Sequence, residues 1–388
     1  MPLPTEIFEE IVATVDELDV LQTFTLACRA ARYACQPILW ERLDVAEHRN
    51  SEFCLLWFRK NSHLARETRI ITFLGPGDHD PSQAQVWYNF DLLLRLVSQG
   101  HKLRSVVVAR FQLNLIRTSQ IFPCLAATIG EARLLVINCT CDHASFADIS
   151  TSGALHLLFS ACSYTNDALL PPALSNVHSF AYDSVNSRFQ CPLDALPVIR
   201  LWTLTTLQVH IFYNQVPWLH HLLRMCEDTL NTLDCRIAYD LATKSIGLPV
   251  CIGRMRQLRS ATFTSDISHS DVLIRSLETI PACLVSLHII LSLDNRSLSD
   301  DMKSIPEIFI LPSTLSRLVV SIIKKHPYAL NCVDDQAFAA DLRLYLKSVF
   351  ASISMDVSFL PPNSAFDVSS DDVSDASHVG PRYGCRFP

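Results

Sequence analysis

The feature that most constrains the fold is a short apolar unit, L-x-x-L-x-L, which returns along the chain from residue 64 onward. Its apolar residues alternate, as they do in a half-buried strand. Six copies are clear: 103–108, 204–209, 230–235, 258–263, 284–289 and 315–320. Weaker copies centre on Ile71, Leu135, Leu158 and Val177. The sequence therefore predicts roughly ten similar strands that stack one on the next.

Between these strands the apolar spacing changes to that of a helix. One such stripe is Trp87, Phe90, Leu94 and Val97, which Gly100 ends. Three more follow: Leu219, Leu222, Leu223 and Cys226; Leu273, Leu277 and Ile280; and Phe338, Leu342, Tyr345, Leu346 and Val349. A helix after each strand can cover the inner face of the sheet, so residues 46–360 are predicted to form an α/β solenoid of strand-plus-helix units. A last strand is expected at 355–359, and the Pro, Ser and Asp content of 361–388 predicts a disordered acidic tail.

Composition excludes several classes of protein. The 388 residues are 49% hydrophobic, which suits a large core, and only 18% charged, with a net charge of -7. A broad basic surface for nucleic acid is therefore not expected. Only 9 glycines argue against Gly-rich phosphate loops. No apolar run reaches the about 18 residues of a membrane span, and the acidic start is unlike a secretory signal. Reduced thiols at the 14 cysteines and a cytoplasmic or nuclear location are expected.

The first 45 residues have a different, helical pattern. Pro4 suits the first position of a helix whose apolar residues recur at 7, 8, 11, 12 and 15. A second helix is predicted to start at Asp19, with Gln22 completing a capping box. A short alanine-rich piece follows, and Pro37 is predicted to restart a helical turn that carries Trp40. So small a module has more apolar surface than its own core needs, which points to a partner or to the rest of the chain.

These residues carry a resemblance. In order and spacing, Leu3-Pro4-x-Glu6-Ile7, Ile11, Leu18, Leu21, Cys28-Arg29, Arg32, Pro37 and Leu39-Trp40-x-x-Leu43 look like an F-box. The resemblance implies that residues 1–45 dock on a Skp-type adaptor and through it on a cullin–RING ubiquitin ligase. The adaptor contacts it implies are Leu3, Pro4, Ile7, Ile11, Leu21, Pro37, Leu39 and Trp40. Alternatively, Ile11 and Leu21 pack in the core of the module. Ala31 stands where the family usually has a bulky aromatic residue, so weaker adaptor affinity is expected.

The repeats resemble the irregular leucine-rich repeats that follow the F-box in many F-box proteins, including a large fungal group. The distances between successive copies run from 19 to 35 residues, mostly in or near the range of that repeat. In a regular repeat an Asn or Cys three residues after the last strand leucine forms a buried ladder. Here the six clear copies have Phe111, Phe212, Ala238, Asp266, Ser292 and Ile323 at that position. A distorted solenoid is expected.

Three groups of residues could carry chemistry. Cys139, Cys141 and His143 could ligate zinc, with Cys162 or His156 as a fourth ligand, although buried structural cysteines are the preferred interpretation. His220 and His221 lie on one helix with Cys226, but positions 221 and 226 share no face well, so solvent-exposed histidines are expected. The 75–80 segment is typical of a turn. We therefore predict no catalytic residue, no metal and no cofactor.

Basic residues on the repeats could attract an acidic or phosphorylated segment, but scattered surface charge is the preferred interpretation of Arg254, Arg256, Arg259, Arg317, Lys324 and Lys325. The sequence thus predicts a non-enzymatic subunit that recruits an unknown target protein to an SCF-type ubiquitin ligase. A second hypothesis is a scaffold without ubiquitin, in which the F-box-like segment only caps the solenoid. A third is a hydrolase or a metal-dependent enzyme that uses residues 139–143.

Overall fold

The computed structural model of the chain describes residues 5–15, 18–45, 48–75, 83–100, 102–113, 132–142, 145, 149, 155–165, 177–185, 203–238, 248–266, 270–293, 315–324, 340, 342–344, 346–347 and 353–360. This part is α/β. Twelve strands form one open sheet in the order β1-β2-β3-β4-β6-β8-β9-β10-β11-β12-β13-β14, and β5 pairs with β7 in a second sheet. Every pair with a described register is parallel. The chain divides into unit 1, residues 1–172 with 381–388, and unit 2, residues 173–380.

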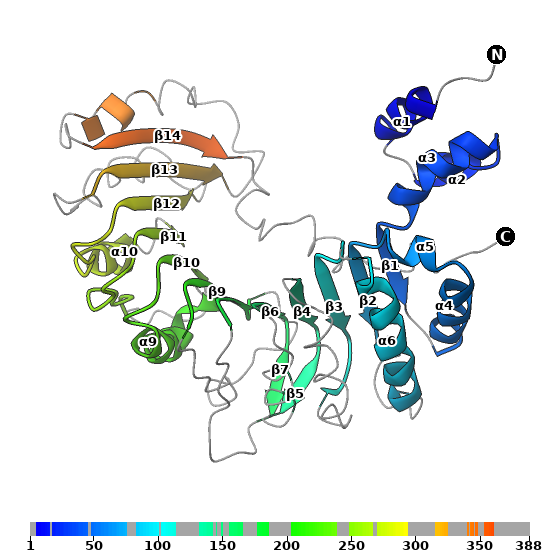
Figure 1. Ribbon diagram of the computed structural model, residues 1–388. Helices are drawn as coiled ribbons and strands as arrows, with labels where there is room; N and C mark the ends of the chain where they lie inside the picture. The colour runs from blue at the N-terminus through cyan, green and yellow to red at the C-terminus, as the bar shows by residue number, and fades with distance from the viewer. Residues whose placement is uncertain are drawn as a thin grey trace. The chain divides into compact units, whose positions relative to one another are not determined.

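Unit 1 begins with three short helices, α1 (Thr5–Ala13), α2 (Leu18–Phe24) and α3 (Arg29–Leu39). Both α1 and α2 pack on α3 (Figure 1). Their shared core consists of Val12, Leu21, Ala34 and Cys35, with Phe8, Val15, Phe24, Ile38 and Leu39 packed against it. The helical pattern predicted for this segment is present, and we call α1–α3 the N-terminal module.

The module differs from the prediction at three points. The second helix begins at Leu18, so Asp19 lies in its first turn and does not cap it. Pro37 does not restart a helix, because α3 runs through it from the N-cap Cys28, whose Sγ accepts from the Ala31 N–H at 3.4 Å. Proline is tolerated there because only one hydrogen bond is lost before the helix ends at Leu39. A strand that was not predicted, β1 (Arg42–Val45), then pairs with the next strand from Arg42↔Ile70 onward.

The remaining strands of unit 1 lie where the sequence predicts them: β2 (Ile70–Leu74), β3 (Ser105–Ala109), β4 (Arg133–Ile137) and β6 (His156–Ser160). The predicted helix is α6 (Gln83–Ser98). Helix α4 (His48–Lys60), which packs against α6, and the short α5 (Ser62–Ala65) were not predicted. Gly100 is needed for close approach, since an added Cβ would lie 2.5 Å from the Arg66 carbonyl oxygen.

Unit 1 turns a similar corner after three of its strands. Arg110, Asn138 and Ala161 directly follow β3, β4 and β6 and have positive φ angles of 63°, 52° and 54°. The N–H of Arg110 donates to the Ile137 oxygen at 3.0 Å, and that of Asn138 to the Ser160 oxygen at 2.9 Å. These bonds join the first two corners to the following strand. Beyond the corners, β5 (Thr140–Asp142) and β7 (Ser163–Thr165) form the small second sheet.

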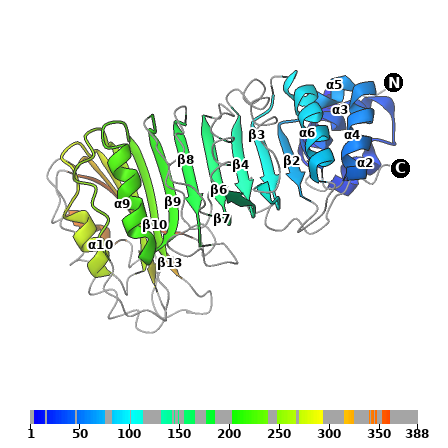
Figure 2. The same ribbon diagram turned by 90° about the horizontal axis from the view of Figure 1, so that it is seen from below.

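Unit 2 contains seven strands of the large sheet: β8 (Ser179–Asp183), β9 (Thr206–Phe212), β10 (Thr232–Ala238), β11 (Ser260–Asp266), β12 (Ser286–Leu293), β13 (Arg317–Lys324) and β14 (Ser354–Leu360). The turn η4 (Tyr213–Gln215) leads into α9 (Val216–Met225), and α10 (Ser270–Leu277) follows β11. Both helices lie on the same face of this part of the sheet (Figures 1 and 2).

The core of unit 2 follows the apolar positions of the repeat. A row of residues in register across five strands is completely buried: Leu207, Leu233, Ala261, Leu287 and Leu318. The predicted strands and the helices at 219–226 and 273–280 are present, with two differences. The strand predicted to centre on Val177 begins only at Ser179, and α10 ends at Leu277, before Ile280. Of the last predicted helix, the described residues are helical, with Leu342 and Leu346 buried, whereas Phe338, Tyr345 and Val349 lie outside the described residues. So does the predicted tail.

Candidate functional site

The first candidate surface is the outside of the N-terminal module. Ile7 and Ile11 are 38% and 40% exposed and lie one turn apart on the same side of α1. Phe8 and Val12 face the core instead. Further large apolar side chains of the module are exposed, and together with Ile7 and Ile11 we call them the hook surface: Ile7, Ile11, Val20, Leu26 and Tyr33. The module therefore completes a core of its own and still presents apolar area to solvent.

The eight adaptor contacts predicted from the sequence divide into three groups. Leu3 and Pro4 lie outside the described residues. Ile7, Ile11 and Pro37 are exposed. The other three are engaged within the chain, because Leu21 is a buried core residue, Leu39 packs against that core and the Trp40 ring stacks on Trp57 with centroids 4.5 Å apart. Leu21 therefore packs in the core of the module, as the alternative interpretation of the sequence predicted, whereas Ile11 does not.

Val20, Leu26 and Tyr33 are additions that the sequence reasoning missed. The apolar periodicity shows that a helix has an apolar side, but not which of its apolar residues face the neighbouring helices. The packing of α1 and α2 on α3 makes that selection. The sequence offers only one signal for such exposed residues, which is a short amphipathic helix with more apolar residues than one face can bury.

The second candidate surface lies on unit 2, on the side of the strands opposite the buried leucines. Because side chains alternate along a strand, the positions between the core residues all point to one face. The register aligns them in two rows across β9, β10, β11 and β12. The first row is Thr206, Thr232, Ser260 and Ser286, and the second is Gln208, Asp234, Thr262 and His288. All eight side chains are half-buried, and we call them the polar face.

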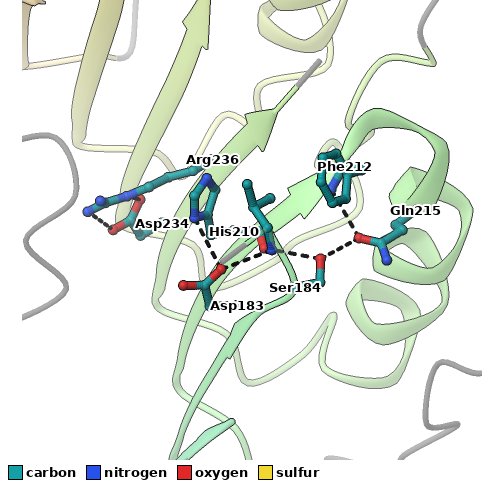
Figure 3. A network of polar contacts seen from close by, with 8 residues as sticks. Asp183, Ser184, His210, Phe212, Gln215, Asp234 and Arg236 are labelled. Carbon is teal, nitrogen blue, oxygen red and sulfur yellow. Dashed lines mark hydrogen bonds and ion pairs between the residues drawn. The ribbon is translucent and has the colours of Figure 1, made fainter. Parts of the chain in front are cut away.

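Next to this face, buried polar groups join β8, β9 and the start of α9 (Figure 3). Asp183 Oδ1 lies 3.2 Å from His210 Nδ1. The Ser184 hydroxyl donates to Gln215 Oε1 at 2.6 Å, and the Phe212 N–H donates to the same oxygen at 3.0 Å. The Ser184 N–H donates to the His210 carbonyl oxygen at 2.9 Å. These bonds fix the β9–α9 turn against β8.

A serine, a histidine and an aspartate thus lie close together, as in a hydrolase triad, but their bonds differ from those of a triad. The Ser184 hydroxyl donates to the Gln215 side chain and contacts the main-chain oxygen of His210 at 3.4 Å. A nucleophilic serine instead gives its proton to the imidazole ring. The described contacts of Ser184 are those of a structural hydrogen bond.

The charges on the polar face are balanced locally. Asp234 accepts from Arg236 of the same strand, at 3.4 Å from Nε and 3.2 Å from Nη2. His288 Nε2 lies 2.8 Å from the Ser321 hydroxyl of β13. Burial lowers the pKa of His288, and the nearby Arg236 and Arg317 lower it further, while Asp234 acts in the opposite direction. Near neutral pH this imidazole is therefore uncharged.

This lowered pKa predicts a pH effect on stability. Below pH 6.5 the unfolded chain binds a proton at His288, whereas in the folded protein this proton binds less readily. The contribution of the neutral His288 side chain to the free energy of unfolding is therefore full above that pH and is lost as the pH falls. We expect the thermal midpoint of the His288→Asn variant to fall less between pH 8 and pH 5 than that of the parent protein. Differential scanning calorimetry at both pH values measures this, with circular dichroism at pH 8 as the folding control. Equal falls in the two proteins would contradict it.

The cysteine cluster is structural in character. Burial raises the pKa of Cys139 well above its usual range, and the nearby Cys162 thiol and burial do the same for Cys141. Thiols held protonated are poor metal ligands and poor nucleophiles. His143 lies outside the described residues, and those residues hold no group of three or more His, Cys, Asp or Glu side chains arranged for a metal ion.

Cys139 and Cys162 instead form hydrogen bonds with main-chain oxygens after adjacent strands. Cys139 Sγ lies 3.5 Å from the Val108 oxygen, and Cys162 Sγ lies 3.2 Å from the Val136 oxygen. Each cysteine follows the last core residue of its strand by three positions, which is where a leucine-rich repeat has Asn or Cys. The sequence reasoning tested that position only in the six clear copies and missed it in these two weaker ones.

The other candidate groups are dispersed. His220 is half-buried, not solvent-exposed as predicted, and its Nε2 lies 3.0 Å from the Pro249 oxygen. Burial raises the pKa of Cys226 to about 12, so it is not an activated thiol. The basic residues Arg254, Arg256, Arg259 and Arg317 are all exposed, whereas Lys325 and residues 76–80 lie outside the described residues. Among the described helices, none has the length and apolar character needed to cross a lipid bilayer.

Comparison with known proteins adds no family. No protein-family model matches this chain, and no curated protein matches it.

Proposed function

We propose that this chain is the substrate-recruiting subunit of an SCF-type cullin–RING ubiquitin ligase. The N-terminal module is then an F-box that binds a Skp-type adaptor, and the strand units are irregular leucine-rich repeats that bind the target protein. The chain performs no chemistry in this role, because ubiquitin transfer belongs to the partner subunits.

One observation carries the proposal, namely that the N-terminal module has a finished core and an exposed apolar hook surface. Val12, Leu21, Ala34 and Cys35 bury one another, so Ile7 and Ile11 are not needed for the module to fold. Exposed large apolar side chains on so small a helical unit, with Ile7 and Ile11 one turn apart on α1, are typical of a protein–protein interface. The F-box resemblance names the class of partner.

The repeats give secondary support for the architecture. Parallel strands in register, repeated corners after β3, β4 and β6, and the hydrogen bonds of Cys139 and Cys162 are features that a leucine-rich-repeat solenoid would have. They bear on the architecture of the target-binding part and not on the identity of the target.

The scaffold hypothesis keeps one specific observation in its favour. Trp40, one of the residues that the F-box resemblance assigns to the adaptor, stacks on Trp57 of α4 and meets Phe58 edge-on at 5.4 Å. This part of the module therefore already has a partner within the chain, as a capping segment would. The two hypotheses differ in one measurable property, which is adaptor binding.

Direct binding of the purified full chain to a purified Skp-type adaptor tests the proposal. We expect micromolar or tighter affinity by isothermal titration calorimetry, and at least tenfold weaker binding by the double variant Ile7→Asp and Ile11→Asp, because a buried carboxylate at an apolar contact loses its hydration without a partner. Leu248→Asp, at an exposed apolar residue of unit 2, is the matched control and should bind as the parent does.

Thermal midpoints and circular dichroism show whether each variant is folded. If the intact chain does not bind the adaptor, the ligase proposal is wrong and the scaffold hypothesis replaces it. The same conclusion follows if both substitutions leave the affinity unchanged in a folded protein.

A further inference from the structure

Helix α4 of unit 1 exposes more apolar side-chain area than the packing of unit 1 requires. It follows β1, the first strand in the order of the sheet, and packs against α6 (Figure 1). Its inner side is complete, because Cys54, Leu55 and Phe58 are buried. On the outer side, Phe53 and Leu56 are 46% and 51% exposed. The core of unit 1 is therefore formed while both of these side chains keep about half of their surface in water.

The spacing of the exposed residues is that of a helix–helix contact. Phe53, Leu56 and Lys60 follow one another at intervals of three and four residues, so they form one row along α4. Glu52 and Arg59 are also exposed and flank this row on one side. We call these five residues the α4 stripe. By contrast, α9, which the structure describes throughout, has no exposed large apolar side chain.

The charges of the α4 stripe are arranged evenly about Leu56. Glu52 lies four residues before Leu56, and Lys60 lies four residues after it, next to Arg59. If two copies of α4 lie antiparallel with their Leu56 side chains opposed, Glu52 of each copy faces the basic end of the other copy. A parallel arrangement would instead bring like charges together. The stripe is therefore complementary to itself, which is what a two-fold interface between identical chains requires.

From these observations we propose that the α4 stripe is a homodimer interface, in which the α4 helices of two copies of this chain pack antiparallel across a two-fold axis. Phe53 and Leu56 of each copy then bury apolar area in the middle of the contact. Glu52 of each copy pairs with the basic end of the other helix, which fixes the direction of the two helices.

The expected dimer is weak. Helix α4 has 13 residues and is about 20 Å long, so a contact through this helix alone falls at the small end of specific interfaces. We expect a dissociation constant of about 10–100 µM. Dimerisation does not depend on the proposed function, because the α4 stripe shares no residue with the hook surface. Adaptor binding and dimerisation can each be absent while the other is present.

Sedimentation velocity of the full chain, over about 1–200 µM so that the expected dissociation constant is spanned, measures the dimer directly. We expect a reversible equilibrium between monomer and dimer. Leu56→Asp should weaken dimerisation at least tenfold, because two carboxylates would then be buried without a partner at the centre of the contact. The matched control is Leu248→Asp, at an exposed apolar residue of unit 2, which should dimerise as the parent does.

Two charge reversals test the antiparallel arrangement. Glu52→Lys makes both ends of the stripe basic, and the double variant Arg59→Glu and Lys60→Glu makes both ends acidic. Each variant alone should dimerise at least fivefold more weakly than the parent, since like charges then face each other. An equimolar mixture of the two should dimerise again, because each basic end meets an acidic one. A fluorophore on one variant identifies the mixed dimer, and circular dichroism shows that both variants are folded.

Three outcomes would overturn the inference. They are an intact chain that stays monomeric at the highest concentration, a dimer that persists in folded Leu56→Asp, and charge-reversed variants that stay monomeric when they are mixed. Recovery of the dimer only in the mixture would establish the antiparallel contact, because mixing two variants does not repair a folding defect in either.

Discussion

Replacing Phe90 by alanine is expected to lower the stability of unit 1 by about 3–5 kcal/mol. Phe90 of α6 is buried, and its ring stacks on Phe73 of β2 with centroids 4.0 Å apart and an interplanar angle of 26°. It also meets Phe111, two residues after β3, edge-on at 5.8 Å. Alanine would remove both ring contacts and leave a cavity between the helix and the sheet, which close packing on either side cannot fill.

Urea titration and the amide hydrogen exchange of β2 and β3 measure this effect. The matched control is Tyr88→Ala on the same helix, because that ring is 58% exposed and its removal should change stability by no more than about 0.5 kcal/mol. Similar losses in the two variants would contradict the packing of α6 on β2.

Replacing Trp218 by alanine is expected to have a comparable effect on unit 2, again about 3–5 kcal/mol. Trp218 lies in the first turns of α9, is largely buried, and has its ring centroid 4.8 Å from that of the buried Tyr182 on β8. Loss of the indole would uncouple α9 from the sheet at the point where the hydrogen-bonded turn around Gln215 begins the helix. The amides of β8 and β9 should therefore lose protection most.

Hydrogen exchange of β8 and β9 with a urea titration tests this second effect. Arg224 is an exposed residue of the same helix, so Arg224→Ala controls for helix propensity. It should change the stability and the exchange protection very little. Trp218→Phe keeps an aromatic ring beside Tyr182 and should recover much of the lost stability. A loss of protection in the Arg224 variant equal to that of Trp218→Ala would show that α9 is held by something other than this contact.

Strand positions were predictable because the information is local. Alternating apolar residues define a strand without reference to any other segment, and the copies centred on Leu207, Leu233, Ala261 and Leu287 became neighbouring strands in direct register. The pattern fails where a strand is short. The four residues of β1 contain only two buried positions, Leu43 and Val45, too few to tell a strand from the end of a helix.

Helix boundaries in the N-terminal module were predicted less well, since capping signals compete with tertiary packing. Asp19 and Gln22 form a plausible capping box, yet α2 begins one residue earlier, where its packing on α3 favours helix. Pro37 ordinarily marks a break, but the N-cap at Cys28 and the buried Ala31, Ala34 and Cys35 hold α3 together through it. Local rules give the existence of these helices, and packing decides their ends.

The sequence by itself determined the repeated strand, the helical start of the chain and the low content of charge. These follow from residue spacing and composition, which every stretch of chain carries locally. The tertiary structure alone decided which apolar residues of the module stay exposed, and that Thr206, Thr232, Ser260 and Ser286 form one row. Both depend on which segments become neighbours, because a face exists only once its members, tens of residues apart in the chain, are brought into register.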